Sequence, residues 1–468
     1  MPSAQVGSVH LQASRYTHVF HYPDGLVLAY NTLTGSLLPL PGNTGARIAR
    51  ALESATTGTL RSPGEPLGDL PERDSLLEMG FLVDGDIDEL MVVKEIWRKG
   101  RRKKGDALLT ILPTLSCNFS CPYCFERHIK GSMTEVVQDA LITFTKVRLL
   151  PRSKELSLEW FGGEPLVGIS VIDSLTTRFR SLCAENGLPA PTASITTNGY
   201  LLCPEMCARL LSLGVSTAQV TLDGPPDIHD RRRPLAGGLP SFDRILRNIK
   251  EAPDGFSIAV RVNVDAGNKD HVFTLIELLH AQGIIPRMAV YVAKVESFSE
   301  ECRSSDGMFL SSAEYASFKN DLHARCRSAG IPWSSDDTPR LVAYGYCVVD
   351  QPKGFVVQPD GELLKCWAEA GNRTGRPVAH LLNASSWGRL ALSPLQSRDP
   401  FDDDECCGCS MLPACMGGCP RIRETLRHQG VKRCPPLRYA LREEVLALYL
   451  RQQDEASEPS PARRLQTI

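Results

Sequence analysis

Three cysteines in one short segment have the spacing of a metal centre. Cys117, Cys121 and Cys124 stand in LSCNFSCPYCFE, with three and then two residues between them. Because thiolate is the preferred ligand of iron–sulfur centres, this array can hold three irons of a [4Fe-4S] cluster. The fourth iron would then be open to bind and activate another molecule. The alternative is a zinc knuckle, which needs a fourth ligand such as His128 to complete a tetrahedron.

A second group of seven cysteines lies toward the C-terminus. Its members are Cys347, Cys366, Cys406, Cys409, Cys415, Cys419 and Cys434, and a Pro-Asp-Gly turn at Gly361 separates the first two. Two four-thiolate zinc sites would explain the Cys-x2-Cys pair but not the five- and three-residue intervals after it. The six other cysteines are expected to be small hydrophobic groups in or near a core: Cys183, Cys203, Cys207, Cys302, Cys326 and Cys407.

Alternating strands and helices are expected to position the first array. The pattern predicts strands at 107–113, 156–160, 193–197, 218–222, 257–264 and 288–295, with helices at 134–149, 170–186, 204–213, 241–250 and 271–282. This alternation indicates an α/β unit of parallel strands with right-handed crossovers. Polar motifs follow successive strands at 162–165, 197–198 and 223. Functional residues of such folds collect at the C-terminal ends of strands, so these motifs should meet there.

The regions around this unit differ in composition. Residues 1–95 are interpreted as a small α+β domain, with β segments at 17–30 and 35–40 and a helix at 42–53. A basic linker at 96–105 leads into the α/β unit at 106–295. A connector at 296–345 contains a helix at 312–329, and the cysteine-rich domain spans 346–440. Residues 441–468 are predicted to be a helix followed by a disordered tail.

Composition excludes several classes of protein. The 468 residues suffice for two or three domains with a core. A net charge of −2 gives no reason to expect nucleic acid as a partner, and no apolar run is long enough to span a membrane. The N-terminus shows no secretory signal, so sixteen cysteines favour metal ligation in a reducing, cytoplasmic setting over disulfides.

Together these motifs resemble the radical S-adenosylmethionine (SAM) enzymes. The matching segments are the cysteine array with Tyr123, Phe161–Pro165, Ile195–Gly199 and Thr221–Pro225 followed by His229, Asp230 and Arg233. The seven later cysteines resemble the SPASM extension of that family, and the likeness covers about residues 109–434. The resemblance implies a partial (β/α)6 barrel with a C-terminal auxiliary-cluster domain. Residues 1–95 resemble the winged-helix peptide-recognition domains that precede many of these enzymes, or are a plain structural extension.

The resemblance also implies roles for particular residues around the first cluster. SAM would bind the open iron and yield a 5′-deoxyadenosyl radical. Gly162 and Gly163 would allow close backbone approach, and Glu164 would accept from the methionine ammonium. Thr197 and Asn198 would contact the ribose hydroxyls. Arg233 would pair with the SAM carboxylate, although the adjacent Arg231 and Arg232 leave the register open.

For the auxiliary clusters the resemblance gives two ligand sets. Cys406, Cys409, Cys415 and Cys434 would hold one [4Fe-4S] cluster, and Cys347, Cys366 and Cys419 would hold three irons of another. Some relatives have an eighth cysteine at the position of Leu341. Cys302, Cys326 or Cys407 could supply the missing ligand, or one iron could stay open.

The function implied is that of a peptide maturase. It would oxidatively crosslink or modify side chains of a ribosomally synthesised precursor peptide, bind the leader with its N-terminal domain, and take electrons from a flavodoxin or ferredoxin. The alternative is an anaerobic sulfatase-maturating enzyme, which forms formylglycine. In that branch an Asp base follows the cysteine equivalent to Cys366, whereas Trp367 stands here and cannot accept a proton. A third hypothesis is an iron–sulfur electron carrier or zinc-stabilised binding module that cleaves no SAM.

Overall fold

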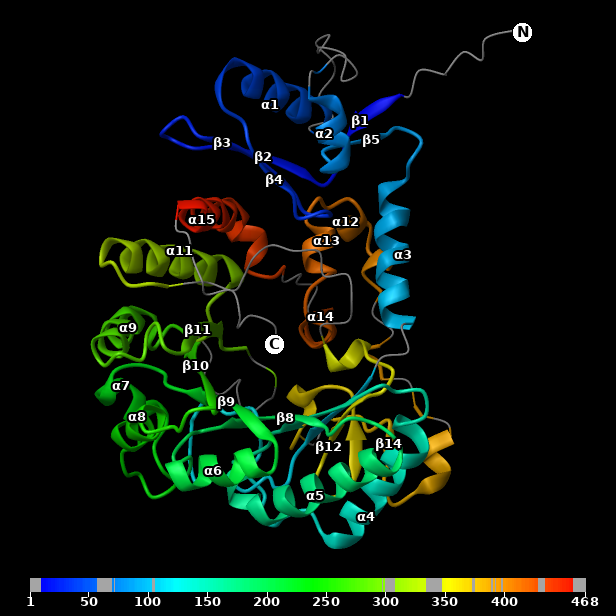
Figure 1. Ribbon diagram of the computed structural model, residues 1–468, viewed down its shortest axis with the longest axis vertical. Coiled ribbons are helices and arrows are strands. Elements are labelled where there is room, and N and C mark those ends of the chain that lie inside the picture. The colour runs from blue at the N-terminus through cyan, green and yellow to red at the C-terminus, as the bar shows by residue number, and fades with distance from the viewer. Residues whose placement is uncertain are drawn as a thin grey trace.

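One large sheet organises the computed structural model (Figure 1). Its nine strands lie in the order β11-β10-β9-β8-β7-β6-β12-β13-β14. The structure describes residues 10–56, 70, 72–102, 106–296, 298, 308–333, 347–372, 375–388, 390–391, 393–396, 399–427 and 434–457. Among the described helices, none combines the length and apolar character needed to cross a membrane.

Six neighbouring strands of this sheet are parallel and form the predicted partial barrel. They are β6 (Ala107–Ile111), β7 (Leu156–Trp160), β8 (Thr192–Thr197), β9 (Val215–Thr221), β10 (Ser257–Val264) and β11 (Ala289–Lys294). The helices between them are α4 (Glu135–Phe144), α5 (Ile169–Glu185), α6 (Pro204–Ser212), α7 (Pro226–Arg232), α8 (Phe242–Lys250) and α9 (Val272–Ala281). The six strands and five of these helices confirm the sequence prediction, and α7 is an addition.

Side-chain alternation along the strands separates the core from the barrel interior. On β10, Val260, Val262 and Val264 are fully buried, while Arg261 and Asn263 between them are partly exposed. Because successive side chains of a strand point to opposite faces, the valines pack under the helices and the polar residues face inward. The parallel sheet therefore presents a polar inner surface.

The cysteine-rich segment continues the same sheet. Its strands are β12 (Gly354–Val357), β13 (Glu362–Leu364) and β14 (Ala379–His380), and β12 runs parallel to β6 with Gly354 opposite Leu108. The turn expected at Gly361 is present, with a φ of +97° that suits glycine, and it joins β12 and β13 as an antiparallel pair. The segment that carries Cys347 and Cys366 is thus built onto the barrel.

The N-terminal unit is an α+β domain at the top of Figure 1. It contains β1 (Leu11–Ala13), β2 (Thr17–His21), β3 (Val27–Asn31), β4 (Leu37–Pro39), α1 (Gly42–Thr56), α2 (Arg73–Glu78), β5 (Leu82–Asp84) and α3 (Glu89–Arg102). Strands β2, β3 and β4 form one antiparallel sheet, and β1 pairs with β5. The single β segment expected at 17–30 is wrong, because a turn at Gly25 divides it into β2 and β3. Residues 98–102 of the basic run belong to α3 and so are helical.

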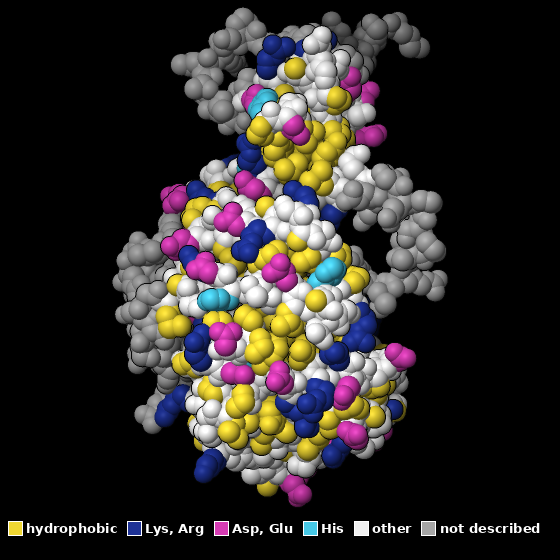
Figure 2. Space-filling view, turned by 90° about the vertical axis from the view of Figure 1, so that its left-hand side faces the viewer, with side chains coloured by type: hydrophobic (Ala, Val, Ile, Leu, Met, Phe, Trp, Pro, Cys, Tyr) yellow, Lys and Arg dark blue, Asp and Glu magenta, His cyan; other side chains and the backbone are white. Residues whose placement is uncertain are grey.

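This unit packs against the C-terminal part of the chain, which contains α11 (Ser312–Ser328), α12 (Asp404–Cys407), α13 (Leu412–Cys415), α14 (Pro420–Arg427) and α15 (Leu437–Ser457). Leu28 and Tyr30 of β3 share a hydrophobic cluster with Met411 and with residues of α15. The hydroxyl of Thr32 donates to the carbonyl of Ser410 at 2.6 Å. Figure 2 shows hydrophobic side chains gathered at the level of this junction. The N-terminal unit is therefore fixed beside the cysteines at 406–419.

Candidate active site

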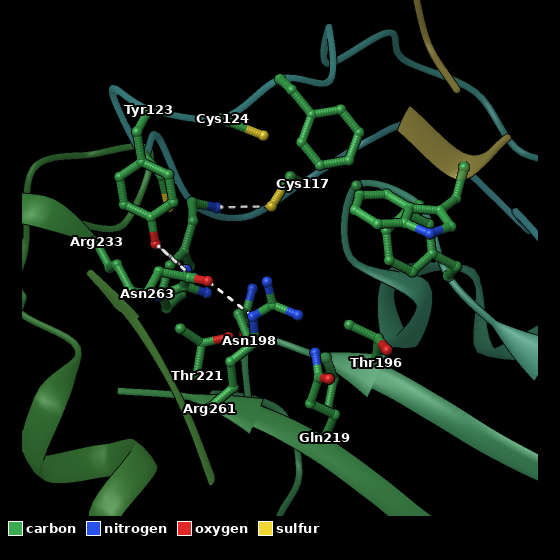
Figure 3. A pocket seen from close by; sticks show the side chains of 18 of the residues that line it. Cys117, Tyr123, Cys124, Thr196, Asn198, Gln219, Thr221, Arg233, Arg261 and Asn263 are labelled. Atoms are coloured by element: carbon green, nitrogen blue, oxygen red, sulfur yellow. Dashed lines mark hydrogen bonds between the residues drawn. The ribbon is translucent and has the colours of Figure 1, made fainter. Parts of the chain in front are cut away.

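A cavity of about 300 Å³ lies at the C-terminal ends of the parallel strands. Cys117, Cys121 and Cys124, on the loop after β6, line one side of it. Polar side chains of the strands line the opposite side, and Figure 3 shows them directed toward the cysteines. This volume is typical of a small-molecule site.

The first three cysteines lie within electrostatic reach of one another. Burial, together with smaller effects of the negative charges of Glu164 and Cys121, raises the pKa of the Cys117 thiol to about 12. Burial also raises the pKa of Cys124, and Glu126 and Cys121 add to that effect. A bound cationic centre would reverse this balance by stabilising the thiolates. Among the described His, Cys, Asp and Glu side chains, no three are grouped closely enough to share a single metal ion.

The two glycines after β7 are needed because their loop touches the cysteine loop. A Cβ on Gly162 would lie 2.6 Å from the carbonyl oxygen of Thr114, and one on Gly163 would lie 2.5 Å from that of Ser116. Gly162 also has a φ of +106°. Both glycines line the cavity, so the predicted close approach to SAM remains a prediction. The observed close approach is to the segment that carries Cys117.

Glu164 has a different environment from the one expected. Its carboxylate is fully buried and accepts hydrogen bonds from the amide of Leu166 at 3.1 Å, the hydroxyl of Thr197 at 2.7 Å and the amide of Asn198 at 2.7 Å. Burial raises its pKa, and these hydrogen bonds oppose the shift. The side chain joins the ends of β7 and β8, and it is absent from the residues that line the cavity.

Thr197 and Asn198 line the cavity but also have protein partners. The Thr197 hydroxyl donates to Glu164, and the Asn198 amide nitrogen donates to the side chain of Asn118 at 2.7 Å. Asn118 lies inside the cysteine array, directly after Cys117. Their predicted contacts with a ribose are untested. Their observed effect is to hold the end of β8 against the cluster loop.

Of the three adjacent arginines, Arg233 is the one that lines the cavity, and its contact with SAM stays a prediction. Its guanidinium donates to the phenol of Tyr123 at 2.5 Å and lines the cavity, whereas Arg232 forms a two-armed ion pair with Asp265 at 2.9 and 2.8 Å. Burial lowers the pKa of Arg233, but the nearby Tyr123, Cys121 and Asp223 outweigh it and raise the pKa well above its usual value. Arg233 is therefore the arginine positioned toward the cysteines.

Asp223 connects this arginine to the strands. It is fully buried and accepts from the Tyr123 phenol and, at 3.0 Å, from the backbone amide of Asn263. His229 accepts from the backbone amide of Asp223 at 3.2 Å, and burial together with Arg233 and Arg232 lowers its pKa well below the usual value. A neutral histidine thus holds the turn after β9 in place.

Several cavity residues were not identified from the sequence. Gln219 and Thr221 on β9, and Arg261 and Asn263 on β10, all line the cavity. The signal was a polar residue at every second position of two otherwise apolar strands. That alternation predicts strands, but it does not show which face of each strand lines a cavity.

Four aromatic rings form one wall of the cavity, which we call the aromatic wall: Phe125, Phe161, Phe298 and Trp367. The ring centroid of Trp367 lies 5.5 Å from those of Phe125 and Phe298 and 6.0 Å from that of Phe161. Phe125 follows Cys124 and Trp367 follows Cys366. Phe298 and Trp367 also share a hydrophobic cluster with Cys347 and Cys366, so the aromatic wall touches both the cavity and part of the second cysteine set.

The seven later cysteines have electrostatic neighbours among themselves, and their assignment to two clusters stays a prediction. Burial raises the pKa of Cys366, and the charges of Cys419 and Cys347 raise it further. Likewise, burial raises the pKa of Cys415 to about 11, with additional effects of Cys409, Cys406 and Cys434.

Two of the three proposed replacements for the missing ligand have other contacts. Cys407 donates to the carbonyl of Phe401 at 3.4 Å, and Cys326 is buried in the barrel core. Cys302 and Leu341 lie outside the described residues.

The cavity, with its cysteine array at the ends of parallel strands, defines a class of enzyme. Residues 111–288 match the model of the Radical SAM superfamily. The chain therefore contains a radical SAM domain, followed by a cysteine-rich region, and is a radical SAM enzyme.

The similarity to known proteins extends beyond the radical SAM domain. The serine-type anaerobic sulfatase-maturating enzyme of Klebsiella aerogenes is 24% identical over 335 residues, which are 65% of this chain and 77% of that protein. The cysteine-type enzyme of Clostridium novyi is 24% identical over 66% of this chain and 86% of its own. The solved structure of native anSMEcpe with bound AdoMet has a TM-score of 0.60 and 18% identity, covering 75% of this chain and 99% of that one. The last likeness shows a shared fold.

Proposed function

We propose that this enzyme is a peptide maturase that modifies side chains of a ribosomally synthesised precursor peptide. The observation that supports it most is the grouping of ten cysteines into three sets, with the first set in a cavity and Cys347 and Cys366 packed against the aromatic wall. Two relatives, matched over 77% and 86% of their lengths, are named as sulfatase-maturating enzymes, so their substrates are proteins. A peptide is therefore the substrate class that we infer for this cavity.

The donor atoms fit the expected cofactors. Three thiols at the cavity leave one iron of a [4Fe-4S] cluster for SAM, and that pair supplies a 5′-deoxyadenosyl radical when bound. The sets Cys347–Cys366–Cys419 and Cys406–Cys409–Cys415–Cys434 would hold two auxiliary [4Fe-4S] clusters. We further infer cytoplasmic reduction by a flavodoxin or ferredoxin.

The residues around the cavity have clear tasks in this scheme. Gly162 and Gly163 let the loop after β7 approach the cysteine loop, and Glu164 fixes that loop to β8. Arg233, held by Tyr123, presents a positive charge where a carboxylate can bind. The aromatic wall excludes water from the side that faces the second cysteine set.

The N-terminal domain offers a place for the leader peptide. Among the described strands, β4 pairs with β3 alone, so its outer edge is available to a further strand. A peptide that adds to a sheet edge gains main-chain hydrogen bonds, and side-chain pockets then give specificity. The domain packs beside α13 and α15, so a bound leader would be anchored on the same body as the cavity.

A second candidate is formylglycine formation on a sulfatase. The likeness to two sulfatase-maturating enzymes over 77% and 86% of their lengths favours it. Trp367 argues against it, because an aromatic ring stands directly after Cys366 and cannot act as a base.

The decisive experiment combines metal content with product mass. Anaerobically reconstituted enzyme should contain roughly twelve irons, and the Cys117→Ala, Cys121→Ala, Cys124→Ala variant about four fewer. The wild type, given SAM and a reductant, should change the mass of the precursor peptide encoded beside it. An unchanged peptide together with a modified sulfatase peptide would reject the first proposal in favour of the second.

A further inference from the structure

The inner surface of the barrel contains a guanidinium, that of Arg261, which forms no ion pair with any described Asp or Glu. Arg261 lies on β10, and Figure 3 shows its side chain reaching up into the cavity between Asn263 and Thr196. Its Nε donates to the side-chain oxygen of Asn263 at 2.8 Å. Within the described part of the chain, no Asp or Glu forms an ion pair with it.

Neighbouring strands hold this guanidinium in a defined orientation. Arg261 lies opposite Tyr291 on β11 and Thr221 on β9. Burial raises the pKa of the Tyr291 phenol, and the nearby positive charge of Arg261 opposes that shift. Tyr291 in turn donates to the side chain of Gln219. Asn263 and the neighbouring strand β11 therefore fix the orientation of the Arg261 guanidinium, and its remaining N–H groups can donate to a ligand.

The other charged groups of the cavity are already balanced by protein atoms. Lys294 forms an ion pair with Glu296 at 2.7 Å, and Glu159 accepts from the hydroxyl of Thr110 at 2.9 Å. Arg233 has Tyr123 and Asp223 beside it. Since a partly buried cation without a counter-ion is unfavourable, Arg261 is the group that most needs an anion from outside the protein.

We propose that Arg261 is a specificity-determining residue that binds a side-chain carboxylate, Asp or Glu, of the substrate peptide. This proposal rests on the proposed function, because it names the substrate class of the same cavity. A guanidinium fork matches the two oxygens of a carboxylate and forms short, charge-assisted hydrogen bonds. The peptide would therefore carry an acidic residue at or beside the modified position.

Two capped amino acids test this without a known substrate. N-acetyl-L-glutamic acid amide and N-acetyl-L-glutamine amide differ only in the side-chain carboxylate, and N-acetyl-L-aspartic acid amide tests the shorter acid. Each is titrated calorimetrically into anaerobically reconstituted enzyme saturated with SAM. We expect at least one acid to bind about tenfold or more tightly than the neutral amide. Equal binding of all three to the wild type would overturn the proposal.

Variants of Arg261 test whether this residue causes the preference for the acid. Arg261→Gln should abolish the preference for the acid, and Arg261→Lys should keep part of it, because a point charge cannot form the two-armed pair. Arg231→Gln is the matched control, since Arg231 is exposed and paired with Asp227 on α7. A preference that survives in Arg261→Gln would refute the assignment. If Arg261→Gln loses iron, Arg261→Lys and the wild-type comparison still decide it.

SAM also carries a carboxylate that could bind Arg261. Measuring the affinity of the enzyme for SAM distinguishes SAM from the substrate peptide as the source of the bound carboxylate. The proposal expects Arg261→Gln to bind SAM within about twofold of the wild type. A tenfold loss of SAM affinity, with no preference among the capped amino acids, would assign Arg261 to SAM and overturn the proposal. Because these measurements need no turnover, they remain valid if no peptide is modified, whereas absent SAM cleavage would reject the proposed function itself.

Discussion

Replacing Glu164 with Gln separates two roles for the carboxylate. In the structure it accepts from three donors: the amides of Leu166 and Asn198 and the hydroxyl of Thr197. Gln keeps one oxygen and turns an NH2 group toward at least one of these donors. One buried donor left without an acceptor costs about 1–3 kcal/mol. We therefore expect a local loss of about 2 kcal/mol at the junction of β7 and β8.

Hydrogen exchange measures this loss directly. A change of about 2 kcal/mol corresponds to roughly thirtyfold faster exchange of amides that open locally. The expected change is confined to peptides containing Leu166 and Asn198. Glu135→Gln is the control, because Glu135 is an exposed residue in the first turn of α4.

The opposite result would support the role expected from the sequence. If exchange at Asn198 is unchanged and SAM affinity falls about tenfold, the carboxylate contacts the ligand and the structural reasoning is refuted. If exchange rises and SAM affinity falls only slightly, Glu164 is a positioning residue.

Three further outcomes are expected. Trp367→Ala should lower the melting temperature and the peptide-dependent consumption of SAM, because it removes three ring contacts worth about 0.5–1.5 kcal/mol each beyond burial. Trp367→Phe should retain most of the melting temperature and of the SAM consumption. An unchanged melting temperature in Trp367→Ala would contradict the aromatic wall. Cys347→Ser should reduce the iron and sulfide of the reconstituted enzyme, whereas Cys183→Ser, in the barrel core, should leave both unchanged; equal losses would count against an auxiliary cluster at Cys347. Burial, with Arg233 and Arg232, lowers the pKa of His229 in the folded state, so the unfolded chain binds more protons below its own pKa of about 6.5. Stability should therefore fall as pH drops below about 6.5, and less so in His229→Gln; equal slopes by chemical denaturation between pH 5 and 7.5 would contradict this.

Periodicity in the sequence was sufficient to predict the barrel. Strand β10 shows why: Val260, Val262 and Val264 alternate with polar residues, and that pattern fits a strand with one face under helices. The sequence predicts one segment at the N-terminal hairpin because strand-forming residues stand on both sides of a short turn at Gly25. A local pattern gives the type of element more reliably than its ends.

The sequence predicted which residues belong to the site better than it predicted the contacts that these residues make. The position of Cys117 after a predicted strand placed it at the C-terminal end of the sheet, and the family resemblance assigned Arg233 to the same site; both line the cavity. The partners of Glu164 could not be predicted, because Thr197 and Asn198 are brought to it only by the pairing of β7 with β8. The role of Arg261 could not be predicted for a related reason: its position between valines on β10 does not show whether that face lines a cavity.

The pairing of β6 with β12 has a consequence for how the chain is made. Leu108 lies opposite Gly354, so one edge of the first barrel strand is completed only by a segment that leaves the ribosome much later. At about 5–20 residues per second, that delay is on the order of ten to fifty seconds. During it, the backbone groups on this edge of β6 are open to pairing with other nascent chains. Chains cut before Gly354 should therefore aggregate, and slower synthesis at low temperature with a chaperone present should raise the soluble yield of the whole protein.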